Sequence, residues 1–138
     1  MRKDFLATGG GGIDWRGGTE TDHKGEDIMT IYITQGRYTD QAIQGFVAKP
    51  EDRAAAVRKL MKAAGGRMIS YYVTLGEYDF LVISEGKDLT GMMGGLIAAA
   101  AGGGVTGLRT TVAMTTADAM KAMAGAKKIG KGFRSAGK

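Results

Sequence analysis

The chain has 138 residues, a length that suits one domain with short extensions. It contains no cysteine, which excludes disulfides, zinc-thiolate centres, iron–sulfur clusters and cysteine nucleophiles. The formal net charge of +5 is concentrated at the C-terminal end, where residues 115–138 hold six basic side chains and one acidic side chain. A polyanion-binding function would therefore have to rest on this tail.

The first 28 residues form a separate segment, rich in glycine and polar side chains and poor in apolar ones. Burial of so few apolar groups cannot offset the backbone entropy lost on folding. We therefore expect residues 1–28 to be a flexible extension or a segment that is not native. The second hypothesis rests on Lys24-Gly25-Glu26, which can be encoded by a purine run that resembles a bacterial ribosome-binding sequence, a few codons before Met29.

The sequence contains no signal for a membrane. The N-terminal segment lacks the apolar core of a signal peptide. The longest apolar run, Leu96 to Ala101, is far shorter than the ~20 residues that a transmembrane helix needs. We expect a soluble cytoplasmic protein with no membrane partner.

The regular pattern of the chain begins with a strand. Residues 30–34 alternate with period two and are rich in β-formers, which predicts the first strand. Thr39-Asp40 supplies helix-capping residues ahead of apolar residues at helical spacing. Lys49-Pro50 interrupts that helix, because the residue before a proline disfavours helical backbone angles. Glu51-Asp52 then places acids at the positive end of a better helix, which ends at Gly65-Gly66.

A hairpin occupies the middle of the chain. Residues 68–75 alternate as a second strand, and residues 79–84 form a third strand that is apolar on both faces, as in a central strand covered on both sides. Gly76 allows the connecting turn to adopt positive φ. We assign Gly76, Glu77 and Asp79 to a structural turn, in which Asp79 bonds backbone amides across the hairpin.

The second helical region has an unusual number of glycines. Asp88 caps a helix whose body covers residues 89–101. Gly91, Gly94 and Gly95 each cost roughly 1 kcal/mol relative to alanine in a helix interior. We expect close packing on a sheet or on a second subunit to compensate for this cost; the alternative is a weak, mobile helix.

The chain ends with a strand, a short helix and a basic tail. The pattern of residues 105–114 predicts the last strand, and residues 115–118 are expected to cap a short helix. From Gly125 onward lysine, glycine and serine dominate, and we expect disorder. A cluster of basic side chains in this tail is the candidate polyanion-binding site: Lys127, Lys128, Lys131 and Arg134.

The order strand, helix, strand, strand, helix, strand predicts a ferredoxin-like α+β fold, with one four-stranded antiparallel sheet and both helices on one face. The strands carry apolar or aromatic residues on both faces, so we expect a second copy of the chain to cover the other face. The protein would then be a homo-oligomer, a dimer or larger. The domain spans residues 29–116, between the extension 1–28 and the short helix and flexible tail of residues 117–138.

Several stretches of the chain occur together in the order seen in a known family. They are Thr30-Ile31-Tyr32-Ile33, Tyr38-Thr39-Asp40-Gln41-Ala42-Ile43, Arg53-Ala54, Tyr72-Val73-Thr74-Leu75-Gly76-Glu77-Tyr78-Asp79 and Leu108-Arg109-Thr110-Thr111. Together they resemble the GYD-domain family of small, largely uncharacterised proteins, named for a Gly-x-Tyr-Asp turn. The resemblance covers about residues 29–116. It implies a ferredoxin-like fold of the dimeric α+β barrel type, in which two sheets face each other, and it implies no function.

A similar turn occurs in the effector-binding domain of leucine-responsive regulators, where amino acids bind between subunits. The candidate ligand site here is lined by Tyr32, Tyr72, Tyr78 and Arg109, between facing sheets. An arginine among tyrosines can hold a carboxylate bidentately or stack on a ring. The alternative for Arg109 is an ion pair with Glu77 or Asp79, at the sheet edge or between subunits.

Catalysis has little support in the sequence. The only histidine, His23, lies in the N-terminal extension, so residues 29–138 have no histidine for acid–base work or for a metal site. We predict no catalytic residue, no cofactor and no metal. The expected function is a non-catalytic, self-assembling domain that binds a small ligand between subunits. The alternatives are a cofactor-independent enzyme of the dimeric α+β barrel type, acting on a small aromatic or carboxylate compound, and nucleic-acid binding through the tail.

Overall fold

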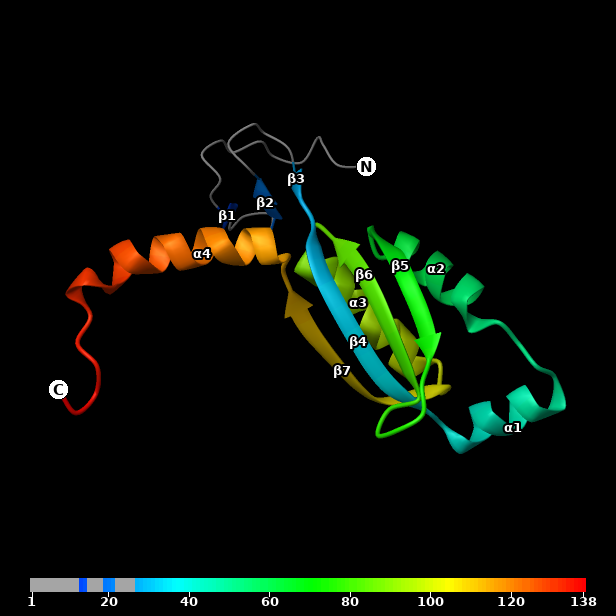
Figure 1. Ribbon diagram of the computed structural model, residues 1–138. Coiled ribbons are helices and arrows are strands. Elements are labelled where there is room, and N and C mark those ends of the chain that lie inside the picture. Colours follow the sequence, from blue (N-terminus) through cyan, green and yellow to red (C-terminus); the bar gives the residue numbers. More distant parts are fainter. Residues whose placement is uncertain (1–12, 15–18, 22–26) are drawn as a thin grey trace.

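The computed structural model describes residues 13–14, 19–21 and 27–138 of the chain (Figure 1). Its main part is a four-stranded antiparallel sheet with the strand order β5-β6-β4-β7. These strands are β4 (Thr30–Tyr38), β5 (Gly66–Val73), β6 (Phe80–Gly86) and β7 (Val105–Ala113). Helices lie between β4 and β5 and between β6 and β7, so the chain has the ferredoxin-like α+β fold that the sequence predicted.

Two helices cover one face of this sheet (Figure 1). Helix α2 (Arg53–Ala63) packs on β5, and helix α3 (Leu89–Ala101) packs on β6 and β7. Helix α1 (Asp40–Ala48) precedes α2 and ends where Lys49-Pro50 was expected to interrupt the helical pattern. The other face of the sheet carries none of these three helices, and we call it the open face.

A small separate sheet lies before β4. Its strands are β1 (Ile13–Asp14), β2 (Thr19–Thr21) and β3 (Asp27–Ile28), which pair antiparallel in that order. The sequence did not predict these strands. Most of the residues for which we expected flexibility or a non-native origin, including Lys24-Gly25-Glu26, lie outside the described residues.

Side-chain caps fix where the helices begin. Thr39 Oγ1 accepts a hydrogen bond from the Ala42 amide at 3.2 Å at the start of α1, and Asp52 Oδ1 accepts one from the Ala54 amide at 2.9 Å at the start of α2. Asp88 caps α3 in the same way. The first amides of a helix have no partner within it, so a side-chain oxygen at this point stabilises the helix start. The caps at Thr39 and Asp88 were predicted from residue type, whereas Asp52 was predicted only as an acid at the positive end of its helix.

The hydrophobic core lies between the sheet and helices α2 and α3. Its centre is formed by Tyr32, Met61 and Met92, of which Tyr32 is 2% exposed. The aliphatic and methionine side chains that pack against this centre are Val57, Leu60, Met68 and Leu96. The strand β6 is an interior strand of the sheet, as its apolar residues predicted.

A β-bulge in β5 decides which face its tyrosines occupy. The pairing of β5 with β6 skips one residue at Ile69. A bulge reverses the alternation of every later side chain relative to Met68, which packs on the core. Tyr71 therefore faces the helices, opposite Val82, whereas Tyr72 faces the open side.

The glycines of α3 allow this helix to approach α2 closely. A Cβ atom at Gly91 would lie 2.4 Å from the Ala64 carbonyl oxygen, and one at Gly95 would lie 3.1 Å from the Ala64 Cβ atom. A Cβ atom at Gly94 would meet nothing within 4 Å. The close approach that the sequence predicted is present, but its partner is the end of α2 rather than a sheet or a second subunit.

Helix α4 (Thr116–Ile129) is longer than the short helix that the sequence predicted, and the 3-10 turn η1 (Gly130–Gly132) follows it. The helix continues past Gly125, where we had expected disorder. Thr115 caps its start. Lys127 and Lys128 lie in its last turn, where their positive charge interacts favourably with the negative end of the helix dipole. Figure 1 shows α4 extending away from the sheet.

Alanine substitutions in α3 test the role of its glycines. Gly91→Ala should lower the free energy of unfolding by about 1–3 kcal/mol, because the new methyl group meets rigid backbone of α2. Gly94→Ala should raise it by about 1 kcal/mol, because the position is open and alanine favours the helix. Chemical denaturation of the two variants would measure both changes. Equal effects at the two positions would show that α3 does not depend on close contact with α2.

Candidate functional site

The Gly-x-Tyr-Asp turn is held by hydrogen bonds within itself. Gly76 has φ of +146°, a backbone angle that side chains other than glycine rarely adopt. The Thr74 amide donates to the Asp79 carbonyl at 2.8 Å, and Thr74 Oγ1 donates to the Tyr78 carbonyl at 2.7 Å. These two bonds close the turn between β5 and β6.

The same turn is also fastened to the end of β4. Asp79 Oδ2 accepts a hydrogen bond from the Tyr38 amide at 2.9 Å, and the Asp79 amide donates to the Gly36 carbonyl at 2.8 Å. Arg37 Nε donates to the Glu77 carbonyl at 2.8 Å, and its guanidinium lies 5.9 Å from the centre of the Tyr78 ring. The Asp79 carboxylate therefore bonds a backbone amide of the neighbouring strand β4, not one across its own hairpin.

Removing this carboxylate tests its structural role. Asp79→Ala should lower the free energy of unfolding by about 1–3 kcal/mol, because the Tyr38 amide loses its acceptor in a partly buried place. The matched control is Glu77→Ala in the same turn, whose exposed side chain should change stability by no more than about 0.5 kcal/mol. Urea denaturation followed by circular dichroism would compare the two variants. A negligible loss for Asp79→Ala would argue against the turn as a structural device.

The open face of the sheet is organised in cross-strand rows. Directly opposed residues of neighbouring strands share a face. The middle row is Ser70, Ile83, Ile33 and Thr111, and the row next to it is Tyr72, Leu81, Gln35 and Arg109. The third row is Arg67, Glu85, Ile31 and Ala113, in which Arg67 Nη2 lies 2.6 Å from Glu85 Oε2. The centre of the open face is thus apolar, and its charges lie on the outer parts.

The four residues of the predicted ligand site do not come together within one chain. Tyr72 and Arg109 share a row of the open face but lie on its two edge strands, three strand spacings or ~14 Å apart. Tyr78 lies in the turn beside Arg37. Tyr32 lies on the helix-covered face, in the centre of the core, and does not share a surface with Tyr72 and Arg109.

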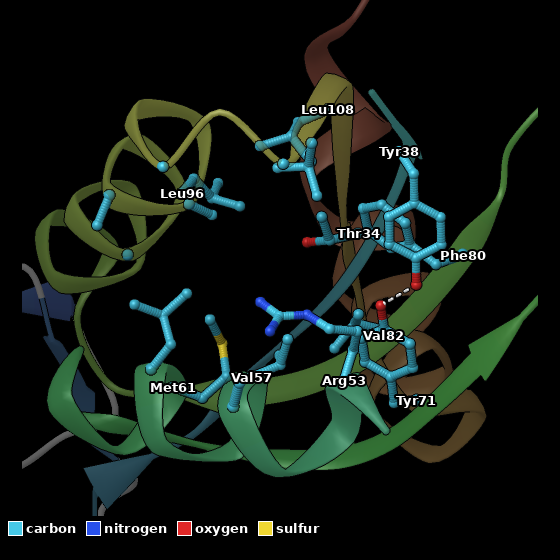
Figure 2. A pocket seen from close by; sticks show the side chains of 18 residues that line it. Thr34, Tyr38, Arg53, Val57, Met61, Tyr71, Phe80, Val82, Leu96 and Leu108 are labelled. Atoms are coloured by element: carbon cyan, nitrogen blue, oxygen red, sulfur yellow. Dashed lines mark hydrogen bonds between the residues drawn. The ribbon is translucent and has the colours of Figure 1, made fainter. Parts of the chain in front are cut away.

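A cavity of about 340 Å³ lies between the sheet and the two covering helices (Figure 2). We call it the helix-side cavity. Helices α2 and α3 touch at one end, where Ala64 meets Gly91 and Gly95. The cavity lies toward the other end of the two helices. Residues from the start of α2 and the end of α3 line it there, including Arg53 and Ala99. The floor is formed by side chains of the sheet, among them Thr34, Tyr38, Tyr71, Phe80 and Val82.

Three hydroxyl groups of the sheet line this cavity, those of Thr34, Tyr38 and Tyr71. The hydroxyls of Tyr38 and Tyr71 are hydrogen-bonded to each other, as the dashed line in Figure 2 shows. Thr34 Oγ1 lies 2.9 Å from Thr110 Oγ1. Burial, and then the hydrogen bond with Tyr38, raises the pKa of Tyr71 far above its ordinary value. Tyr71 therefore stays a neutral phenol and a hydrogen-bond donor in the whole physiological pH range.

Arg53 is the only charged side chain among the described residues that line the helix-side cavity. It is the first residue of α2, and Figure 2 shows its guanidinium extending into the cavity. Its Nη1 atom pairs with Glu51, which does not line this cavity. This site was not predicted from the sequence. One sequence pattern could have indicated it. An arginine stands in the first turn of a helix, and the apolar face of that helix packs on strands that carry several hydroxyl side chains.

The basic residues of the tail lie together at the end of α4 and in the segment that follows. Lys127, Lys128, Lys131 and Arg134 are all exposed. They remain a candidate surface for polyanions. Within the described part of the chain, no group of three or more histidine, cysteine or acidic residues could hold a metal ion. None of the helices in that part is long and apolar enough to cross a bilayer.

Comparison with known proteins identifies the family. The family model of the GYD domain matches residues 32–123. The match runs from the third residue of β4 into α4 and includes the Gly-x-Tyr-Asp turn, both covering helices and the hairpin. The chain belongs to the GYD domain family, as its sequence motifs indicated. Neither the curated proteins nor the solved structures contain a match to the chain.

Proposed function

We propose that the chain is a non-catalytic domain that assembles with further copies of itself through the open face of its sheet. The observation that carries this proposal is the apolar centre of the open face, where Ile33 and Ile83 lie side by side on the two interior strands. Leu81 and Ile31 flank them, and Tyr72 at the edge is 58% exposed. The four aliphatic side chains are partly exposed in the single chain, and a contiguous apolar patch of this kind marks an association surface.

A second copy is the occupant that fits this face best. Two sheets can stack face to face and bury both apolar centres, because a two-fold pair uses the same patch on each chain. The resulting pair of facing sheets is the α+β barrel arrangement that the resemblance to the GYD-domain family implies. The charged residues Arg67 and Arg109 would lie at the rim of the interface, where water still reaches them, whereas Glu85 is already buried in the single chain beside Arg67.

A charge placed at the centre of the open face should prevent assembly. We expect the full-length protein to have the mass of a closed oligomer in light scattering, and Ile33→Lys to reduce that mass to one chain, because a lysine cannot be buried without a partner. Val47→Lys on α1, which is 80% exposed and lies outside the sheet, is the matched control and should leave the oligomer intact.

Circular dichroism would show that both variants keep their secondary structure. The proposal fails if the unchanged protein is a monomer at all concentrations tested. It also fails if Ile33→Lys, still folded, has the same mass as the unchanged protein.

Facing sheets would also complete the small-ligand site that we expected between subunits. Tyr72 and Arg109 occupy the two ends of one cross-strand row. A two-fold axis parallel to the strands exchanges the two ends, so Tyr72 of one copy would lie over Arg109 of the other. A guanidinium beside a phenol ring is a site for a small carboxylate, and Tyr78 at the rim would lie near its entrance. In this arrangement Tyr32 supports the sheet from the opposite face.

Because the chain has no cysteine, this geometry can be tested by trapping introduced cysteine pairs with a short bismaleimide cross-linker. The double variant Tyr72→Cys with Arg109→Cys should form a covalent dimer, because facing sheets stack ~10 Å apart. Such a linker spans this distance, which exceeds the ~4.4–6.8 Å Cα separation of a disulfide. The control pair is Tyr72→Cys with Val112→Cys, since Val112 is exposed on β7 but opposes Tyr32 on the other face. Equal trapping of both pairs would contradict the proposed orientation of the two sheets.

A further inference from the structure

We infer that the helix-side cavity binds a small, apolar monocarboxylate whose charged group is held by Arg53. This inference does not depend on self-association, because every residue that forms the cavity comes from one chain. It also differs from the site expected between facing sheets, because the two sites lie on opposite faces of the sheet.

The shape and lining of the cavity define the body of the ligand. A volume of about 340 Å³ is at the small end of the range for ligand pockets, which suits a compound of small size. Its walls are mainly apolar side chains of the two helices and the sheet, such as Val57, Leu96 and Leu108 (Figure 2). A ligand body that matches these walls is a short alkyl chain or an aromatic ring.

The single charge of the cavity defines the head group. A guanidinium that extends into an apolar cavity favours an anion, because charge and hydrogen bonds together offset the cost of removing the anion from water. Among the described lining residues Arg53 supplies the only cation. It can balance one negative charge on the head group of the ligand but not two or more. A monocarboxylate meets this requirement, whereas a phosphorylated compound would leave charge unpaired.

The tyrosine pair offers a second contact to the same head group. In a pair of phenol hydroxyls one donates to the other, and the accepting hydroxyl keeps its own proton free. Both Tyr38 and Tyr71 line the cavity, so this remaining O–H can donate to a ligand oxygen. Because Tyr71 does not ionise at physiological pH, its hydroxyl does not repel an anion.

Glu51 acts as the competitor of the ligand. It pairs with Nη1 of Arg53, and both side chains are partly exposed, 48% for Glu51 and 38% for Arg53. An exposed ion pair of this kind is weak and can exchange one carboxylate for another. The arrangement therefore predicts opposite effects for its two members: loss of Arg53 weakens binding of the carboxylate, and loss of the Glu51 charge strengthens it.

The test uses the full-length protein and two probes of nearly equal shape, octanoate and octanamide. Isothermal titration calorimetry should show octanoate binding more tightly than octanamide, which lacks the charge. Arg53→Met keeps most of the apolar stem of the side chain and should weaken octanoate binding about tenfold or more, with little change for octanamide. Glu51→Gln should strengthen octanoate binding.

Two further variants separate the cavity from other surfaces. Arg58→Met, an exposed position of the same helix outside the cavity lining, should leave octanoate binding unchanged. Ala99→Leu adds volume to the wall and should weaken both probes while thermal unfolding shows that the fold is kept. The inference is overturned if neither probe binds the unchanged protein. It is also overturned if the two probes bind equally, or if Arg53→Met and Arg58→Met have the same effect.

Discussion

The hydrogen bond between the Asp79 carboxylate and the Tyr38 amide is the contact on which the rest of the domain depends. It joins the turn between β5 and β6 to the end of β4, through two residues that are 41 positions apart in sequence. With the Asp79 amide bonded to Gly36, it fixes where Phe80 begins β6. Tyr38 and Phe80 then pack with their ring centres 5.1 Å apart, and Tyr71 stacks on Phe80 at 5.9 Å. This aromatic group forms one end of the floor of the helix-side cavity.

The two faces of the main sheet differ in what covers them. Helices α2 and α3 cover one face and enclose both a packed core and a cavity. The open face has an apolar centre and no covering helix among the described elements (Figure 1). A single layer of helices on a sheet that is apolar on both sides leaves one face to be buried by another layer. Self-association and ligand binding can therefore be separate properties of opposite faces of one sheet.

The spacing of α2 and α3 explains why the cavity exists. The glycines of α3 bring its first turns against the end of α2, where Ala64 leaves no room for a side chain at Gly91. Helices are stiff, so contact at one end and a wider separation at the other leave a space that small residues such as Ala99 and Gly102 do not fill. Arg53 stands at this wider end, at the start of α2.

The sequence by itself determined the order of the elements from β4 to β7, the caps at Thr39 and Asp88, the turn at Gly76 and the GYD family, because these depend on local residue types and on periodicity. It did not determine which tyrosines face the same way. Strict alternation from Met68 would put Tyr72 on the helices and Tyr71 on the open face. The bulge at Ile69 reverses both, and only the pairing of β5 with β6 reveals it.

The helix-side cavity likewise could not be predicted from the sequence. Its wall joins residues from the start of one helix, the end of another and all four strands of the main sheet, and the space between them depends on the angle at which two helices pack. Sequence periodicity identifies the apolar face of each helix but not the distance to its neighbour. The tertiary structure alone decided that Arg53, Tyr38 and Tyr71 line one cavity, because long-range packing brings these three side chains together.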